Sequence, residues 1–185
     1  MPPSQPLVRL VQVPGWVARP AGTGSGSGAV GAASALAREI VEREARSAFG
    51  TRDLTWARTE AGRPYLAELP DFHFSISHSG PHVGVAFGGA ARCGLDIEWT
   101  GRAVELAVAR RFAADERDYV ESGPAGTPAG RLLEVWTKKE SYLKWLGQGL
   151  GAGLSRFSVL DSAALGVRFV DVSRAGLIGH ICAVD

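Results

Sequence analysis

Short segments of apolar and β-branched residues recur along the chain, and turn residues bound each of them. The first, LVRLVQV at residues 7–13, predicts a β-strand. Four more strands are predicted up to residue 98, and three after residue 155. The predicted segments are 54–58, 72–77, 82–88 and 92–98, then 156–160, 167–172 and 178–184, with turns at EAGRP (60–64) and HSGPH (78–82).

Helical periodicity appears in three other regions. Leu36, Ile40 and Val41 share one face of the segment 31–48, and Gly50 follows it as a stop. A second helix is predicted near 103–121 and a long third helix at 130–146.

The order of these elements repeats. Each half of the chain is predicted to contain a strand, a helical region and three antiparallel strands, which indicates an internal duplication. We therefore expect an α+β protein, a pseudo-dimer of two similar halves at 1–91 and 92–185. The interface between the halves is the expected place for a ligand and the active site.

Two acidic residues lie in a predicted strand, CGLDIEW at 93–99. Asp96 and Glu98 are two positions apart, so their side chains share a face. Like charges at this distance raise each other's pKa. One interpretation is a solvated strand face. The other is a bound cation that removes the repulsion.

A third carboxylate lies on the long helix. Glu140 and Lys144 are four residues apart, beside an apolar stripe of Leu133, Trp136 and Leu143. They form either a surface ion pair worth about 0.3–0.5 kcal/mol, or a cluster in which Glu140 joins the strand carboxylates. Oxygen ligands of this kind suit Mg²⁺.

The segment FHFSISHSG at 72–80 offers polar groups at a strand end. Ser77 and His78 are suited to a phosphate, or they belong to a polar hairpin turn. A Ser–His nucleophile pair is disfavoured because adjacent side chains diverge.

A glycine pattern, Gly26, Gly28 and Gly31 followed by Asp53, matches a dinucleotide fingerprint only nominally. That motif requires a tight turn directly after a strand. Twelve residues separate Val13 from Gly26, so a flexible loop is favoured.

Composition excludes several classes. The net charge of +1 over 185 residues favours neither a nucleic-acid nor a membrane partner. The two cysteines, Cys93 and Cys182, lack a CxxC partner and are expected to be buried, reduced thiols. The N-terminus lacks the pattern of a signal peptide and no apolar run reaches about 18 residues. A cytoplasmic protein is therefore expected.

Four motifs together resemble the 4′-phosphopantetheinyl transferases of the surfactin-synthetase-activating type. They are GRPYL (62–66), FSISHSG (74–80), GLDIE (94–98) and WTKKESYLKWLGQGL (136–150), and the resemblance covers roughly 31–160. It implies a pseudo-dimer with coenzyme A between its halves, and a monomer is expected because the two halves already form the cleft. It also implies Mg²⁺-dependent transfer of 4′-phosphopantetheine from coenzyme A to a serine of an acyl- or peptidyl-carrier protein, with release of 3′,5′-ADP. Such carriers serve fatty acid, polyketide and nonribosomal peptide biosynthesis.

The resemblance also implies roles for individual residues. Glu140 is the first candidate for the general base, either directly or through a water, and Glu116 in RFAADERDYV is the alternative. Arg63 stands where the family has lysine in a GKP motif. The implied metal ligands are Asp96, Glu98 and Glu140; the implied coenzyme contacts are Arg63, Pro64, Ser77, His78, Asp96 and Lys144.

The sequence departs from the family before the first helix, where a basic segment is usual. Arg19 is the single cation there, and Arg38 is a candidate replacement. Arg110, Arg111 and Phe112 are candidates for a carrier-docking edge, or part of an ordinary amphipathic helix. A non-catalytic coenzyme A or carrier-binding module and a Mg²⁺-dependent phosphohydrolase are the alternative functions.

Overall fold

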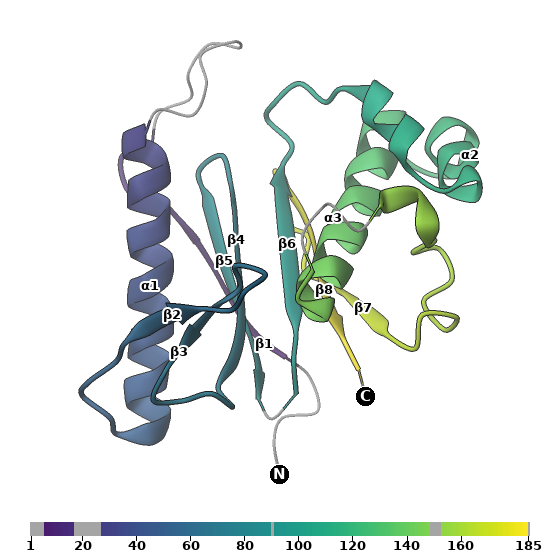
Figure 1. Ribbon diagram of the computed structural model, residues 1–185. Coiled ribbons are helices and arrows are strands. Elements are labelled where there is room, and N and C mark those ends of the chain that lie inside the picture. The colour runs from purple at the N-terminus through teal and green to yellow at the C-terminus, as the bar shows by residue number, and fades with distance from the viewer. Residues whose placement is uncertain (1–5, 17–26, 90, 149–152, 185) are drawn as a thin grey trace.

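The computed structural model describes residues 6–16, 27–89, 91–148 and 153–184. Helix α1 (Ser27–Phe49) lies at one side, two three-stranded sheets follow, and helix α3 (Pro128–Leu146) lies at the other side (Figure 1). This is a mixed α/β fold with antiparallel sheets, in agreement with the expected class.

The first sheet has the order β1-β5-β4, with antiparallel pairing throughout. Its strands are β1 (Leu7–Gln12), β4 (His73–Ser79) and β5 (His82–Gly89). Helix α1 covers one face of this sheet, because its apolar stripe packs on alternate residues of the strands. The buried residues of this cluster include Ile40, Val41, Phe74, Val83, Val85 and Phe87.

Strands β2 (Trp56–Arg58) and β3 (Pro64–Leu66) form a separate hairpin. Strand β3 was missed by the sequence analysis, which assigned Pro64 to a turn. Proline is compatible with the first residue of a strand, where its missing N–H is tolerated. The turn is therefore one residue shorter than predicted.

The second sheet has the order β6-β8-β7 and is also antiparallel. Its strands are β6 (Gly94–Trp99), β7 (Arg168–Asp171) and β8 (Leu177–Ala183), and α3 packs on one of its faces. The hydroxyl of Thr127 accepts from the N–H of Gly130 at the start of α3, and Gly147 ends the helix with φ of 74°.

Two predictions in the second half were wrong. The helix expected at 103–121 is broken into a 3₁₀ helix, Leu106–Arg111, and α2 (Ala114–Ser122). The break falls where Phe112 and Ala113 adopt extended backbone. The strand expected at 156–160 is absent, so in the described residues only β7 and β8 follow α3, not three strands.

The dinucleotide-type glycine pattern does not form the loop that this motif needs. Gly28 and Gly31 lie within α1, while Gly26 is outside the described residues. A glycine loop closing directly on a strand is thus not formed by this segment.

The two sheets have equivalent strand orders. In each, the strand that comes first in sequence pairs with the last, and the last pairs with the middle one: β1-β5-β4 and β6-β8-β7. A helix follows the first strand in both cases, α1 in one and α3 in the other.

Serine side chains of β4 connect the sheets to each other. The hydroxyls of Ser75, Ser77 and Ser79 accept from the backbone N–H groups of Leu95, Ile97 and Trp99, at 2.9, 3.3 and 3.0 Å. The residue numbers rise in the same direction along both strands, so β4 and β6 run parallel. We call these three contacts the serine ladder.

A buried apolar cluster lies between the two sheets, with Leu95 and Ile97 from β6. Gly84 allows this close approach, because a Cβ there would lie 2.9 Å from side-chain atoms of Leu10 and Leu95. The serine ladder and this cluster fix β6 against the first half.

Cys93 and Cys182 are buried free thiols, as predicted. Burial raises the pKa of each to about 12. Among the described helices, none combines the length and the apolar character that a membrane span requires.

Candidate active site

Helix α3 approaches β6 closely at Gly94. A Cβ at this position would lie 1.9 Å from the carbonyl oxygen of Ser141, so only glycine fits. Three residues after Ser141, the side chain of Lys144 reaches β6. Its Nζ lies 2.8 Å from Oδ1 of Asp96 and 2.9 Å from the carbonyl oxygen of Leu95.

Two carboxylate oxygens beside this ion pair have no hydrogen-bond partner. They are Oδ2 of Asp96 and Oε1 of Glu140, and both are buried. A buried oxygen that has lost water without gaining a donor is costly, at about 1–3 kcal/mol. Burial, and then the charge of Asp96, raise the pKa of Glu140 to about 7.

Glu98 faces the same region, but its carboxylate has donors. Ser79 donates to Oε2 at 2.5 Å, and Arg102 forms an ion pair with the same oxygen at 2.8 Å. Burial raises the pKa of Glu98, and the charge of Asp96 contributes. The charge of Glu98 in turn helps to raise the pKa of Glu140. The structure thus brings all three predicted carboxylates within electrostatic range of one another.

Two cations partly relieve this repulsion: Lys144 contacts Asp96, and Arg102 contacts Glu98. Within the described ranges, no three Asp, Glu, His or Cys side chains are grouped so that they could hold a metal ion as they stand. What the site does offer is two bare, buried oxygens from two carboxylates.

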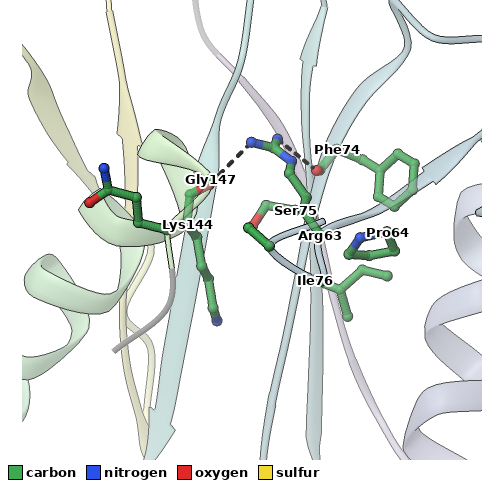
Figure 2. A pocket seen from close by; sticks show the side chains of 10 residues that line it. Arg63, Pro64, Phe74, Ser75, Ile76, Lys144 and Gly147 are labelled. Carbon is green, nitrogen blue, oxygen red and sulfur yellow. Dashed lines mark hydrogen bonds between the residues drawn. The ribbon is translucent and has the colours of Figure 1, made fainter. Parts of the chain in front are cut away.

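One cavity opens beside Lys144, and a second cavity adjoins it. The nearer, of about 210 Å³, is lined by Gly62, Arg63, Pro64, Ile76, Lys144 and Gln148 (Figure 2). The larger, of about 590 Å³, shares Pro64 and Ile76 with it, so the two are adjacent. The larger cavity adds three cationic or titratable side chains and one large aromatic ring: Arg38, Arg58, His78 and Trp56.

Arg63 lies between α3 and the first sheet (Figure 2). Its guanidinium donates to the carbonyl oxygens of Lys144, Phe74 and Cys93 at 3.1, 3.2 and 3.2 Å. It lines the nearer cavity, but these bonds also make it a connector of three segments.

The remaining predicted coenzyme contacts differ in accessibility. His78 is exposed and Pro64 is half-buried, and both line a cavity. Ser77 is buried, and its hydroxyl donates to Oδ1 of Asp96 at 2.8 Å. Arg38 lies over the ring of Trp56, 4.7 Å from its centroid. Arg19 is outside the described residues.

Glu116 is not part of this site. Its side chain is fully buried and pairs with Lys139 at 2.7 Å, and it also accepts from the N–H groups of Ala113 and Val159. With both oxygens engaged and no exposed surface, it cannot take a proton from an incoming serine. In this structure Glu116 therefore belongs to a buried ion pair, and Glu140 is the remaining candidate base.

Phe112 is also fully buried, so it cannot form part of a docking edge. Arg110 and Arg111 are exposed. The sequence analysis missed Ser79 and Arg102, although Ser79 continues the alternation that begins at Ser75.

Comparison with known proteins points to the same class. Residues 92–178, which carry the three carboxylates and Lys144, match the family model of the 4′-phosphopantetheinyl transferase superfamily. The resemblance inferred from the four motifs is thereby confirmed.

Individual relatives extend the similarity into the first half. The chain is 39% identical over 98 residues to the 4′-phosphopantetheinyl transferase psf-1 of Bacillus pumilus, covering 52% of this chain and 41% of that protein. It is 34% identical over 125 residues to the 4′-phosphopantetheinyl transferase Sfp of Bacillus subtilis (strain 168), covering 67% and 54%. The chain thus spans about half the length of these curated relatives.

Proposed function

We propose that this protein transfers 4′-phosphopantetheine from coenzyme A to a serine of an acyl- or peptidyl-carrier protein and releases 3′,5′-ADP. The observation that carries the proposal is the pair of bare, buried carboxylate oxygens of Asp96 and Glu140 beside Lys144. The relatives named as 4′-phosphopantetheinyl transferases support the same activity.

The proposal includes a pseudo-dimer, with halves at 1–91 and 92–185 and the active site between them. The equivalent strand orders of the two sheets support it. So does the origin of the site, because Lys144 and Asp96 come from the second half while Arg63 and Pro64 come from the first. A cytoplasmic monomer stays a prediction.

The carboxylates fit Mg²⁺. This ion prefers oxygen ligands, keeps several waters and is commonly bound by one or two carboxylates plus substrate phosphates. Oδ2 of Asp96 and Oε1 of Glu140 are oxygens of this kind, and Glu98 is the candidate third ligand. When bound, the ion neutralises charge on the diphosphate and on the leaving group.

Lys144 and Glu140 have separate roles in the proposed reaction. The Lys144 ammonium adds a cation where negative charge develops on the leaving phosphate. The serine oxygen of the carrier bonds to the β-phosphorus, the bond from that phosphorus to the bridging oxygen breaks, and Glu140 takes the serine proton. The pKa of Glu140 is about 7 in the protein without a cation. A bound Mg²⁺ would lower it, so a water held by Glu140 is the alternative acceptor for the serine proton.

The adjoining cavities are the proposed site for coenzyme A. The diphosphate lies nearest Lys144 and Arg63, and the adenosine end extends into the larger cavity. Arg38, Arg58 and His78 line that cavity, and we propose that they bind the 3′-phosphate in place of the basic segment that relatives carry before the first helix.

The test is a mass measurement. Apo-carrier protein incubated with coenzyme A, Mg²⁺ and this protein is expected to gain about 340 Da, the mass of the phosphopantetheine group. Asp96→Ala and Glu140→Ala are expected to lose most of this activity while remaining folded by circular dichroism. Retained activity in either variant removes that residue from the site.

Two other outcomes point to other functions. Coenzyme A binding by calorimetry without a mass change indicates a binding module. Release of inorganic phosphate without modification of the carrier indicates a phosphohydrolase. Either result refutes the proposal.

A further inference from the structure

We infer that Ser77 and Ser79 are positioning residues, which hold Asp96 and Glu98 so that one oxygen of each carboxylate is available to a divalent cation. The inference rests on the proposed function only in taking these carboxylates as cation ligands. It assigns to the serine ladder a role beyond joining the two sheets.

Each of these hydroxyls makes two bonds to neighbouring residues of β6. Ser77 accepts from the N–H of Ile97 and donates to Oδ1 of Asp96, at 3.3 and 2.8 Å. Ser79 accepts from the N–H of Trp99 and donates to Oε2 of Glu98, at 3.0 and 2.5 Å. Because the N–H group anchors the hydroxyl oxygen, the direction of its proton is restricted toward the carboxylate.

In both cases a cationic side chain donates to the same oxygen as the serine. Lys144 joins Ser77 at Oδ1 of Asp96, and Arg102 joins Ser79 at Oε2 of Glu98. Donors therefore converge on one oxygen of each carboxylate. For Asp96 the other oxygen, Oδ2, is left buried and without a partner.

Loss of the serine hydroxyl would release this arrangement. Without the serine, Oδ1 of Asp96 is held by Lys144 alone, so the carboxylate can rotate and accept from Lys144 through both oxygens, in competition with a cation. Residues that orient metal ligands commonly change metal affinity about 10–100-fold when they are removed. We therefore expect Ser77→Ala and Ser79→Ala each to weaken cation binding by about tenfold or more.

Ser75 provides a matched control. It forms the same kind of rung, accepting from the N–H of Leu95 at 2.9 Å, and it is as buried as Ser77. Its neighbour across the ladder is Gly94, which has no side chain to orient. Ser75→Ala thus measures the loss of a rung without the loss of a carboxylate contact.

The experiment titrates Mn²⁺ into the whole protein and follows the free ion by electron paramagnetic resonance. The free energy of unfolding of each variant is measured in parallel. We expect Ser75→Ala to bind Mn²⁺ as the wild type does, and Ser77→Ala and Ser79→Ala to bind it about tenfold more weakly. Ser79→Thr, which keeps the hydroxyl, is expected to restore the affinity.

Equal Mn²⁺ affinity across the three alanine variants, or a wild type that binds no Mn²⁺, overturns the inference. The mass measurement on the carrier separates this failure from failure of the proposed function. A wild type that modifies the carrier while the serine variants keep full affinity refutes the positioning role alone. A wild type that shows the serine dependence but modifies no carrier refutes the transferase alone.

Discussion

The guanidinium of Arg63 donates to the carbonyl oxygen of Lys144, with Nη1 at 3.1 Å. This bond links the β2–β3 hairpin to the last turn of α3. In that turn, the side chain of Lys144 reaches Asp96. The same guanidinium also holds the carbonyls of Phe74 and Cys93, at the start of β4 and just before β6. One side chain therefore connects three of the elements that build the site.

Arg63→Lys is expected to lower the free energy of unfolding by about 1–3 kcal/mol, although it keeps the charge. Lysine carries a compact ammonium on a flexible stem and cannot reproduce the planar fork that serves three carbonyls. Urea denaturation measures the change. Arg58→Lys is the control, because Arg58 bonds a single exposed carbonyl, that of Gly62. An Arg63→Lys variant as stable as the wild type would show that its charge alone matters.

Lys144→Met is expected to reduce the rate of carrier modification by about 10²–10³-fold, the usual loss for one preorganised group that stabilises transition-state charge. Lys138→Met is a control on the same helix, where the lysine pairs with Glu134 instead of the carboxylate cluster. Initial rates with saturating coenzyme A and Mg²⁺ measure both. Equal rates for the two variants would contradict the role of Lys144.

Local pattern predicted most of this architecture but not its connections. The alternation in CGLDIEW correctly placed Asp96 and Glu98 on one face, because strand geometry is set by neighbouring residues. The contacts of Arg63 and the serine ladder join segments 11 to 81 residues apart. No periodicity within one segment contains that information.

For Glu116, the local structure itself was predicted wrongly. Its motif suggested a role in catalysis, and a continuous helix was predicted around it. The extended backbone at Phe112 and Ala113 breaks that helix, so Glu116 points into the core against Lys139. A turn without glycine or proline gives little signal in the sequence. The wrong prediction of a continuous helix therefore gave no warning that Glu116 would be buried away from the active site.

Glu140 is expected to make stability depend on pH when no divalent cation is present. Its pKa is raised in the folded protein from 4.5 to about 7. As the pH rises through this window, the unfolded chain releases the proton while the folded protein keeps it, so the free energy of unfolding falls. Above pH 7 the contribution is constant.

Glu140→Gln removes this contribution. In EDTA, the variant is expected to gain stability relative to the wild type between pH 5 and pH 8. Urea denaturation at the two pH values measures the difference between variant and wild type. A difference that does not grow with pH would contradict the raised pKa of Glu140.

His180 is expected to act in the opposite direction. Burial lowers its pKa from 6.5 to about 4 in the folded protein, with its Nδ1 2.8 Å from the Thr137 hydroxyl. Between these values the unfolded chain binds a proton that the folded protein does not, so stability is lost as the pH falls from 6.5 to about 4. His73, His82 and Glu98 also have shifted pKa values, so the slope is isolated by comparing Glu140→Gln with and without His180→Gln. Unfolding measured at intervals across that range should show a difference that changes with pH, and a constant difference would exclude the role of His180.

Glu116→Gln tests whether the buried pair with Lys139 is structural. Both side chains have 0% exposure, and Glu116→Gln leaves the Lys139 ammonium buried without its counter-charge, at a cost of about 3–5 kcal/mol. Replacing both residues, as Glu116→Gln with Lys139→Met, should recover part of this loss because no buried charge remains. Glu121→Gln, at an exposed position of α2, is the control and should change stability by no more than about 0.5 kcal/mol.

The mass measurement, made at a temperature where circular dichroism shows Glu116→Gln to be folded, separates stability from catalysis. Turnover near that of the wild type is expected, and a folded variant without turnover would return Glu116 to the reaction.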